Sequence, residues 1–386
     1  MRTARRALRA ALLVIIVGIT VGISAALLPT DTTAASRSGE LRMILLSPVQ
    51  ATPDGLTRRK RDGATGIVLN LTGGEREAAR GAAGRVKRAG LDLYYWIEVA
   101  RCPELADAHP EWMASLQGHP QWRRHFPRTP QPTAGQVVKN YPWVPIRYRD
   151  AFKAHLGRVQ GLVQGLPAAK GIFLNDLQAA PSACGCGNLL CRWVPDYGPI
   201  RTATTLPPDA AARFVSAVRE FSPKSEIIPV WTTECEEHEM PKGAACQGVP
   251  CFTGACWYAY AEQLMPVARA SRTLAALVPY RAFGRDDPRY GPKAGWVRHA
   301  LATFAQMPPK RKGEAIPAER IVAVLQGWDV TPEERQAQIQ QAREAGARGY
   351  VLAEMEIPQG WEPRIVTAPS APAAGAAPEH PAHRQP

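Results

Sequence analysis

The stretch ERIVAVLQGWDVTPEERQAQIQQAREAGARGYVLAEME, residues 319–356, contains a complete strand–helix–strand pattern. Its first and last apolar runs, 319–328 and 347–356, are rich in branched residues and short enough to be buried strands. Between them, Thr331 is a favourable N-cap, followed by Pro at the first helical position and by two acidic residues. Gly346 ends the helix just before the second run. Two strands joined by a helix in this way predict a parallel βαβ unit.

The same pattern recurs along the rest of the chain. Six further apolar runs lie at 41–49, 65–72, 91–100, 170–177, 225–234 and 273–280. Helix-favouring segments lie between several of them, at 74–90, 149–166 and 207–222. Eight strands that alternate with helices predict an α/β fold, a (β/α)8 TIM-like barrel. The absence of a glycine-rich phosphate turn after the first strand argues against a dinucleotide-binding sheet.

The two ends of the sequence differ from the middle. Four arginines in the first nine residues precede an uncharged apolar run at 10–28, a pattern typical of export. We expect residues 1–36 to be a signal-anchor, with a cleaved signal peptide as the alternative, and 37–366 to be the barrel domain in the cell envelope. Residues 367–386 are rich in Ala and Pro and predict a disordered tail.

Long segments rich in cysteine and tryptophan follow the third, fourth and fifth predicted strands, at 101–148, 178–206 and 235–254. In a barrel, such segments all emerge on the face where active sites lie. All eight cysteines follow the third, fourth or fifth predicted strand: Cys102, Cys184, Cys186, Cys191, Cys235, Cys246, Cys251 and Cys256. Export and an even count favour disulfides, whereas the C-x-C-x4-C spacing leaves a structural zinc site open and free thiols are the third alternative.

The net charge of +13 favours acidic partners. Because Lys and Arg are spread along the chain without a nucleic-acid-binding signature, we expect no nucleic-acid partner. An acidic polysaccharide fits better, since arginines in the long segment after the third strand could hold its acidic groups, although a solvated loop surface explains them too. The membrane is the other expected partner, through the N-terminal segment.

Carboxylates at predicted strand ends are the candidates for catalysis, because a barrel places them around one mouth. Asp176 follows the run GIFLN directly and is the first candidate, with Glu234 or Glu354 as its partner. One carboxyl that holds a proton and one that stays ionised would suit hydrolysis of a glycosidic bond. The alternative is that Asp176 caps a loop or pairs with an arginine.

Aromatic and polar residues near the same strand ends are candidates for binding a saccharide. They are Trp112, Trp122, Trp143, Trp231, Gln326, Trp328 and Glu356. Tryptophan rings stack well on sugar rings, although each of these tryptophans could instead pack a long loop onto the barrel.

The run DLYYWIEVARCPELADAHPEWM (92–113), with FLNDL (173–177) and CGCGNLLCRW (184–193), resembles the glycoside hydrolase-like (β/α)8 barrels of bacterial exported proteins. The resemblance covers about 70–355 and implies that Asp176 matches the acid after the fourth strand. Asn175 stands where that family often has a second acid. As a whole, the resemblance implies a hydrolase that acts on a polysaccharide and requires no cofactor. A non-catalytic binding barrel and a metal-dependent hydrolase are the alternatives.

Overall fold

The structure is a computed structural model that describes residues 39–71, 74–113, 127–146, 148–177, 209–232, 264–278, 295–305, 315–357 and 363–367. It comprises a short unit, Met1–Glu40, and a larger unit, Leu41–Pro386. Every element described below belongs to the larger unit.

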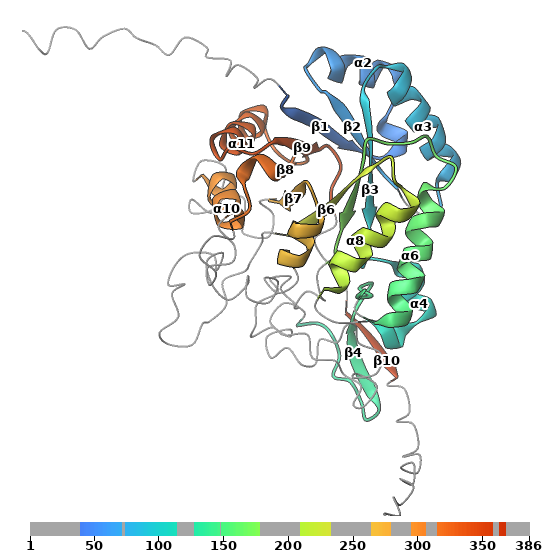
Figure 1. The fold of residues 1–386 in the computed structure, drawn as a ribbon. Coiled ribbons are helices and arrows are strands. Elements are labelled where there is room, and N and C mark those ends of the chain that lie inside the picture. Colours follow the sequence, from blue (N-terminus) through green and yellow to red (C-terminus); the bar gives the residue numbers. More distant parts are fainter. Residues whose placement is uncertain are drawn as a thin grey trace, which may run out of the picture. The chain divides into compact units, whose positions relative to one another are not determined.

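Eight parallel strands close a barrel in the order β1-β2-β3-β5-β6-β7-β8-β9 (Figure 1). Their bounds are β1 (Leu41–Leu46), β2 (Gly66–Asn70), β3 (Asp92–Glu98), β5 (Gly171–Asn175), β6 (Glu226–Thr232), β7 (Leu274–Leu277), β8 (Ile321–Gln326) and β9 (Gly349–Ala353). The barrel closes where β9 pairs with β1, for example at Val351 and Met43. Each of the eight apolar runs contains one of these strands, so the (β/α)8 prediction is confirmed.

Helices cover the outside of the barrel. The longer ones are α2 (Pro53–Arg61), α3 (Arg76–Arg88), α6 (Arg149–Val163), α8 (Ala210–Phe221), α10 (Trp296–Ala305) and α11 (Pro332–Glu344). In α11 the hydroxyl of Thr331 accepts a hydrogen bond from the Glu334 backbone N–H at 3.2 Å, and the Glu334 side chain accepts one from Thr331. Gly346 follows with a φ of 79°, a conformation that glycine adopts without strain. The start and stop signals in the sequence therefore act as predicted.

Side chains of each strand alternate between two cores. One cluster contains only strand side chains and a few residues that follow β8 and β9, and it fills the barrel; Met43, Trp96 and Phe173 belong to it. The other cluster lies between strands and helices and contains Ile67 and Leu174. Because successive side chains of a strand point to opposite faces, this alternation decides which strand-end residues can reach the barrel mouth.

A second, two-stranded sheet lies outside the barrel and was not predicted. It pairs β4 (Gln136–Asn140) with β10 (Pro363–Thr367) in antiparallel register. The predicted boundary at 366 therefore falls inside a strand. Short helices lie in the connecting segments: η1 (Pro48–Gln50), α4 (Pro103–Ala108), η2 (Pro110–Trp112) and η6 (Ala318–Arg320).

Several predictions concern residues outside the described ranges. They include the apolar segment 10–28, the Ala/Pro-rich tail beyond Thr367, and the two long segments at 178–206 and 235–254. Among the residues that the structure describes, no helix is both long and apolar enough to cross a membrane.

Candidate functional site

Two neighbouring strands bring Glu98 and Asn175 together at the carboxyl end of the barrel. The two residues are register partners in the pairing of β3 with β5. Trp96 and Phe173, two positions earlier on each strand, point into the barrel, so Glu98 and Asn175 point inward too. Asn175 Nδ2 donates to Glu98 Oε2 at 2.7 Å, and Trp96 Nε1 donates to Glu98 Oε1 at 2.7 Å. Both oxygens of Glu98 therefore accept an N–H.

Asp176 joins this group although strand alternation alone would turn it outward. Its φ of 60° ends the strand in the left-handed region, which Asp tolerates better than most residues. Its buried carboxyl group is hydrogen-bonded to Glu98, and its Oδ2 lies 3.3 Å from Arg101 Nε. Burial raises the pKa of Asp176 well above its usual range, Arg101 opposes this, and the neighbouring Glu98 raises it further. The raised pKa and the hydrogen bond to Glu98 together favour the protonated form of Asp176, which can donate to Glu98.

The segment after β3 positions Arg101. Arg101 forms an isolated antiparallel bridge with Trp143, and Val144 N donates to Ala100 O at 2.9 Å. The guanidinium of Arg101 lies 5.5 Å from the centroid of the Trp143 ring, within range of a cation–π contact. Arg158 of α6 donates to the Glu98 backbone carbonyl at 2.9 Å. We call Glu98 and Asp176 the acid pair. The segment after β3 and helix α6 hold this pair in place, in addition to the two strands that carry it.

Polar atoms at the strand ends add to the binding capacity of this mouth. The amide oxygens of Asn70 and Asn175 and the indole nitrogen of Trp328 are buried and have no hydrogen-bond partner in the part of the chain that is described. Trp328 packs against the interior cluster. Gln326 is buried at the end of β8, and its Nε2 donates to the Trp328 carbonyl at 3.1 Å. The Gln326 and Trp328 candidates therefore lie on the interior side of the barrel.

The Glu354 candidate lies on the other side of its strand. Tyr350 and Leu352 pack in the cluster beneath the helices, and Glu354 continues that row. Its Oε2 accepts from Arg59 Nε of α2 at 3.0 Å. The structure thus pairs Glu354 with a helix rather than with the acid pair. Glu356 is exposed.

The tryptophan candidates fall in different environments. Trp231 is fully buried in the cluster between strands and helices, because it occupies an outward position of β6; this differs from the expected role in saccharide binding. Trp143 is buried beside Arg101, and Trp112 stacks on the His109 ring at 3.7 Å between centroids. Trp122 and Glu234 lie outside the described residues.

Of the eight cysteines, the structure describes Cys102. It is a free, buried thiol that donates to Glu104 Oε2 at 3.3 Å, which differs from the expected disulfide. Burial raises the pKa of this thiol, so it is a poor nucleophile. The other seven cysteines, and with them the choice between disulfides and zinc, lie outside the described ranges. Within those ranges, no group of three His, Cys, Asp or Glu side chains could hold a metal ion.

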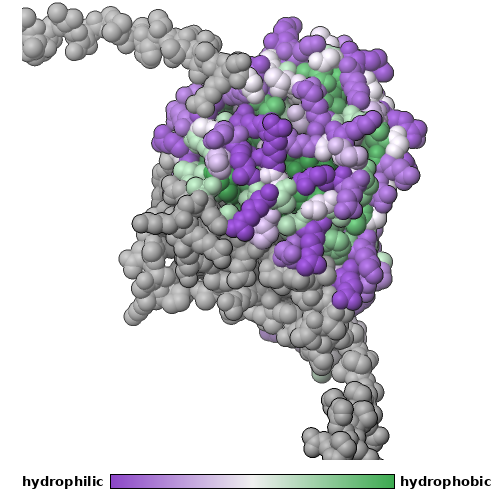
Figure 2. Space-filling view, in the orientation of Figure 1, coloured by the Kyte–Doolittle hydropathy of each residue, from purple (hydrophilic) through white to green (hydrophobic). Residues whose placement is uncertain are grey.

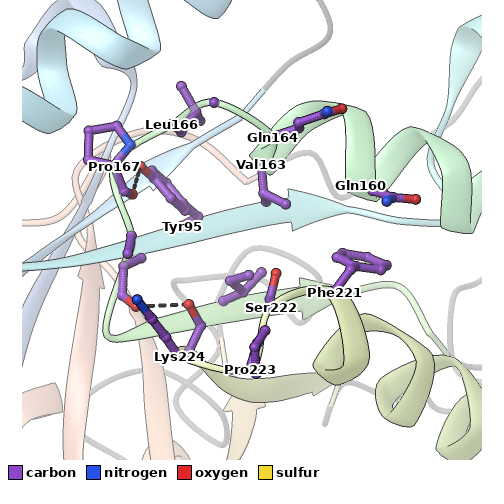
Figure 3. Close-up of a pocket in the computed structure, with 15 residues that line it drawn as sticks. Tyr95, Gln160, Val163, Gln164, Leu166, Pro167, Phe221, Ser222, Pro223 and Lys224 are labelled. Atoms are coloured by element: carbon purple, nitrogen blue, oxygen red, sulfur yellow. Dashed lines mark hydrogen bonds between the residues drawn. The ribbon is translucent and has the colours of Figure 1, made fainter.

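A hollow of about 370 Å³ lies away from the acid pair, between the carboxyl ends of α6 and α8 (Figure 3). Its lining includes Val163, Phe221 and Lys224, and the Tyr95 hydroxyl donates to the Pro167 carbonyl at 2.7 Å beside it. Tyr95 and Ile172 point outward from their strands, so this hollow lies outside the barrel. No Asp or Glu lines this hollow. We therefore place the candidate site at the barrel mouth, where Glu98 and Asp176 lie.

Comparison with known proteins adds information on the fold alone. No protein-family model matches the chain, and no curated protein sequence matches it. Similar solved structures include the hyperthermostable endo-1,4-β-D-mannanase of Thermotoga petrophila RKU-1, with a TM-score of 0.43, 11% identity and coverage of 83% of this chain and 92% of that one. The β-galactosidase of Rahnella sp. R3 has a TM-score of 0.45 and 12% identity over 83% of this chain, which spans about half (51%) of that chain. The C-terminal domain of ChiA from Legionella pneumophila has a TM-score of 0.37 and 12% identity, covering 73% of this chain and 76% of that one.

Proposed function

We propose that the chain is a glycoside hydrolase-like enzyme that acts on a polysaccharide, with Asp176 as its general acid. The observation that carries this proposal is the hydrogen-bonded pair of the buried Asp176 and the half-buried Glu98 at the carboxyl ends of two neighbouring strands. A carboxyl group that stays protonated near neutral pH can protonate a glycosidic oxygen, which an ordinary ionised Asp cannot do.

The two acids divide the work. Asp176 gives its proton to the leaving oxygen as the C–O bond breaks, and Arg101 stabilises the carboxylate that remains. Glu98, with two N–H donors on its oxygens, supplies negative charge near the positive sugar ring of the transition state. Water adds to the sugar carbon, and the proton that the water loses restores the protonated state of Asp176 at the end of the cycle.

Glu98 is not assigned as a nucleophile. In retaining enzymes the acid and the nucleophile are about 5 Å or more apart, and in inverting enzymes they are farther apart still. A directly hydrogen-bonded pair is closer than either arrangement. Glu234, which follows the fifth predicted strand, is the proposed partner that activates water or attacks the sugar.

Substrate contacts follow from the polar atoms that the described chain leaves without a partner. The amide oxygens of Asn70 and Asn175 can accept from sugar hydroxyls, and the Trp328 N–H can donate to one. We also propose that the barrel lies in the cell envelope, held by the apolar segment 10–28, and that its polysaccharide is acidic. The arginine content of the long segment after the third strand (101–148) and the basic charge of the chain support this.

A carbohydrate-binding barrel without catalysis is the second candidate. It is favoured by the ion pair between Arg101 and Asp176, since a paired and buried acid is less available to a substrate. Binding of a polysaccharide with no release of new chain ends would support this candidate over the enzyme.

The test compares two matched variants of the full-length chain on a panel of neutral and acidic polysaccharides. Asp176→Asn keeps a donor for Glu98 and an acceptor for Arg101 but has no proton to transfer, so we expect a rate about 10²- to 10⁴-fold lower with the fold intact. Asp92→Asn changes a carboxylate at the opposite end of β3, where it pairs with Lys170, and should leave the rate unchanged. Release of reducing ends measures the rate, and full activity in Asp176→Asn would overturn the assignment.

A further inference from the structure

The carboxyl ends of α2 and α3 carry a concentration of positive charge. The last turn of α2 consists of four consecutive basic residues, Arg58–Arg61, and the last turn of α3 contains three more. Lys60 Nζ donates to the Ala89 carbonyl at 2.7 Å, so the two helix ends lie side by side. We call the exposed members of this group the basic patch: Arg58, Lys60, Arg61, Lys87 and Arg88.

Local acids and helix dipoles do not balance this charge. Within residues 58–63 and 85–90 the one acid is Asp62, which lies 3.8 Å from Arg61, so the patch has five positive charges and one negative, a surplus of four. Each helix end offers the equivalent of about half a negative charge, which offsets about one of the four. Elsewhere at this end of the barrel, Lys170 pairs with Asp92 and Arg348 with Glu226. The surplus therefore fits an anionic partner.

The basic patch lies at the opposite end of the barrel from the acid pair. Residues 62–65 lead from α2 directly into β2, and Thr65 N donates to the Arg42 carbonyl at 2.8 Å, next to the start of β1. Figure 1 shows α2 and α3 beside β1 and β2, and Figure 2 shows hydrophilic side chains over these helices. Leu41 is the first residue of β1, so the preceding chain reaches the barrel at this same end.

We infer that the basic patch contacts the surface of an anionic lipid bilayer. This inference rests on the proposed anchoring by residues 10–28, because residues 29–40 can span at most about 43 Å between that segment and Leu41. An anionic surface raises the partitioning of a basic residue next to it by about fivefold, so the roughly three charges that the helix dipoles leave unbalanced would give an effect on the order of a hundredfold. The acid pair would then face away from the membrane, toward polysaccharide.

The test measures labelling of lysines by a membrane-impermeant amine reagent, read by mass spectrometry. The full-length chain is reconstituted in vesicles of phosphatidylcholine, with or without about one third phosphatidylglycerol. We expect the anionic lipid to lower labelling of Lys60 and Lys87 several-fold and to leave Lys153, exposed near the start of α6, unchanged. Salt at 0.5 M should restore labelling, because the screening length then falls to about 4 Å.

Two double variants with the same change in charge separate the patch from the overall charge. Lys87→Glu with Arg88→Glu should restore labelling of Lys60 on anionic vesicles, whereas Arg149→Glu with Lys153→Glu, on exposed residues of α6, should not. Equal labelling of Lys60 on both kinds of vesicle would overturn the inference. So would equal protection by a soluble acidic polysaccharide at matched charge, which would assign the patch to a glycan.

Two further measurements distinguish the proposed anchor and the proposed enzyme activity from the basic patch. Flotation of the chain with phosphatidylcholine vesicles tests the anchor, and it can succeed while the labelling test fails. Hydrolysis by the solubilised chain tests the acid pair independently of both.

Discussion

Asp176 and Glu354 occupy equivalent places in the sequence pattern, since each follows a strand of the barrel within one residue of its end. Their surroundings are opposite. Asp176 turns toward the interior and is hydrogen-bonded to Glu98, whereas Glu354 stays on the helix side and pairs with Arg59. A position at the carboxyl end of a barrel strand places a residue near the mouth. Whether its side chain points into the mouth depends on which side of the strand it lies.

Asp176 and Glu354 also differ in the number and burial of the residues that they contact. Glu98 and Asp176 are linked to Trp96, Asn175 and Arg101 in one network, of which Trp96, Asn175 and Asp176 are buried. The ion pair of Glu354 with Arg59 involves side chains that keep 20% and 18% of their exposure. A buried network is costly to break, whereas a partly exposed pair contributes little.

The largest expected effect comes from removing the centre of the buried network. Glu98→Ala leaves the Trp96 and Asn175 N–H groups and the Asp176 proton without an acceptor. Each unpaired buried donor costs about 1–3 kcal/mol, so we expect a loss of about 3–5 kcal/mol in the free energy of unfolding. Urea denaturation would measure it, with Glu354→Ala as the matched carboxylate. Equal losses in the two variants would remove the contrast between them.

The pH dependence of stability tests the protonated state of Asp176. Its pKa is raised in the folded chain, so the folded state keeps a proton that the unfolded state releases. Stability should therefore fall as pH rises from about 4, the usual pKa of an Asp, toward the raised pKa, by at most about 1.4 kcal/mol per pH unit.

Asp176→Asn removes this proton exchange and provides the reference. The free energy of unfolding of the wild type relative to this variant should decrease with pH, measured by urea denaturation at each unit between pH 4 and 8. An increase with pH would mean that the ion pair with Arg101 outweighs burial and the neighbouring Glu98.

Arg101 should set the upper pH limit of the proposed activity. Its positive charge lowers the pKa of Asp176, so Arg101→Met should raise that pKa further and keep the acid protonated to higher pH. We expect the descending limb of the pH–rate profile to move up by about one unit. Arg101→Lys keeps the charge and should leave the limb close to its wild-type position, so a shift of the same size in both variants would argue against a purely electrostatic role.

The periodicity of apolar residues in the sequence was sufficient to predict the barrel and the position of part of the candidate site. Each of the eight runs contains a strand, because parallel strands buried on both faces are continuous apolar segments. Alternation in DLYYWIE also puts Tyr94, Trp96 and Glu98 on one face, so the inward position of Glu98 could have been predicted from its strand. The same rule, applied to GYVLAE, would have placed Glu354 on the helix side.

Contacts between distant segments could not be predicted in this way. The pairing of β4 with β10 joins residues more than two hundred positions apart, and neither strand is apolar enough to be recognised alone. The left-handed φ of Asp176 breaks the strand alternation at the residue that matters most. Arg101 reaches Asp176 because the chain after β3 bridges to Trp143, a contact that no local pattern encodes.

The smallest expected effect comes from Glu354→Gln. The variant keeps an oxygen that can accept from Arg59 and loses an ion pair that is partly exposed, so the free energy of unfolding should fall by about 0–1 kcal/mol. Polysaccharide hydrolysis should be unchanged, because the side chain continues the helix-facing row of β9. A rate loss as large as that of Asp176→Asn would place Glu354 at the mouth. The side of the strand would then not explain the difference between Glu354 and Asp176.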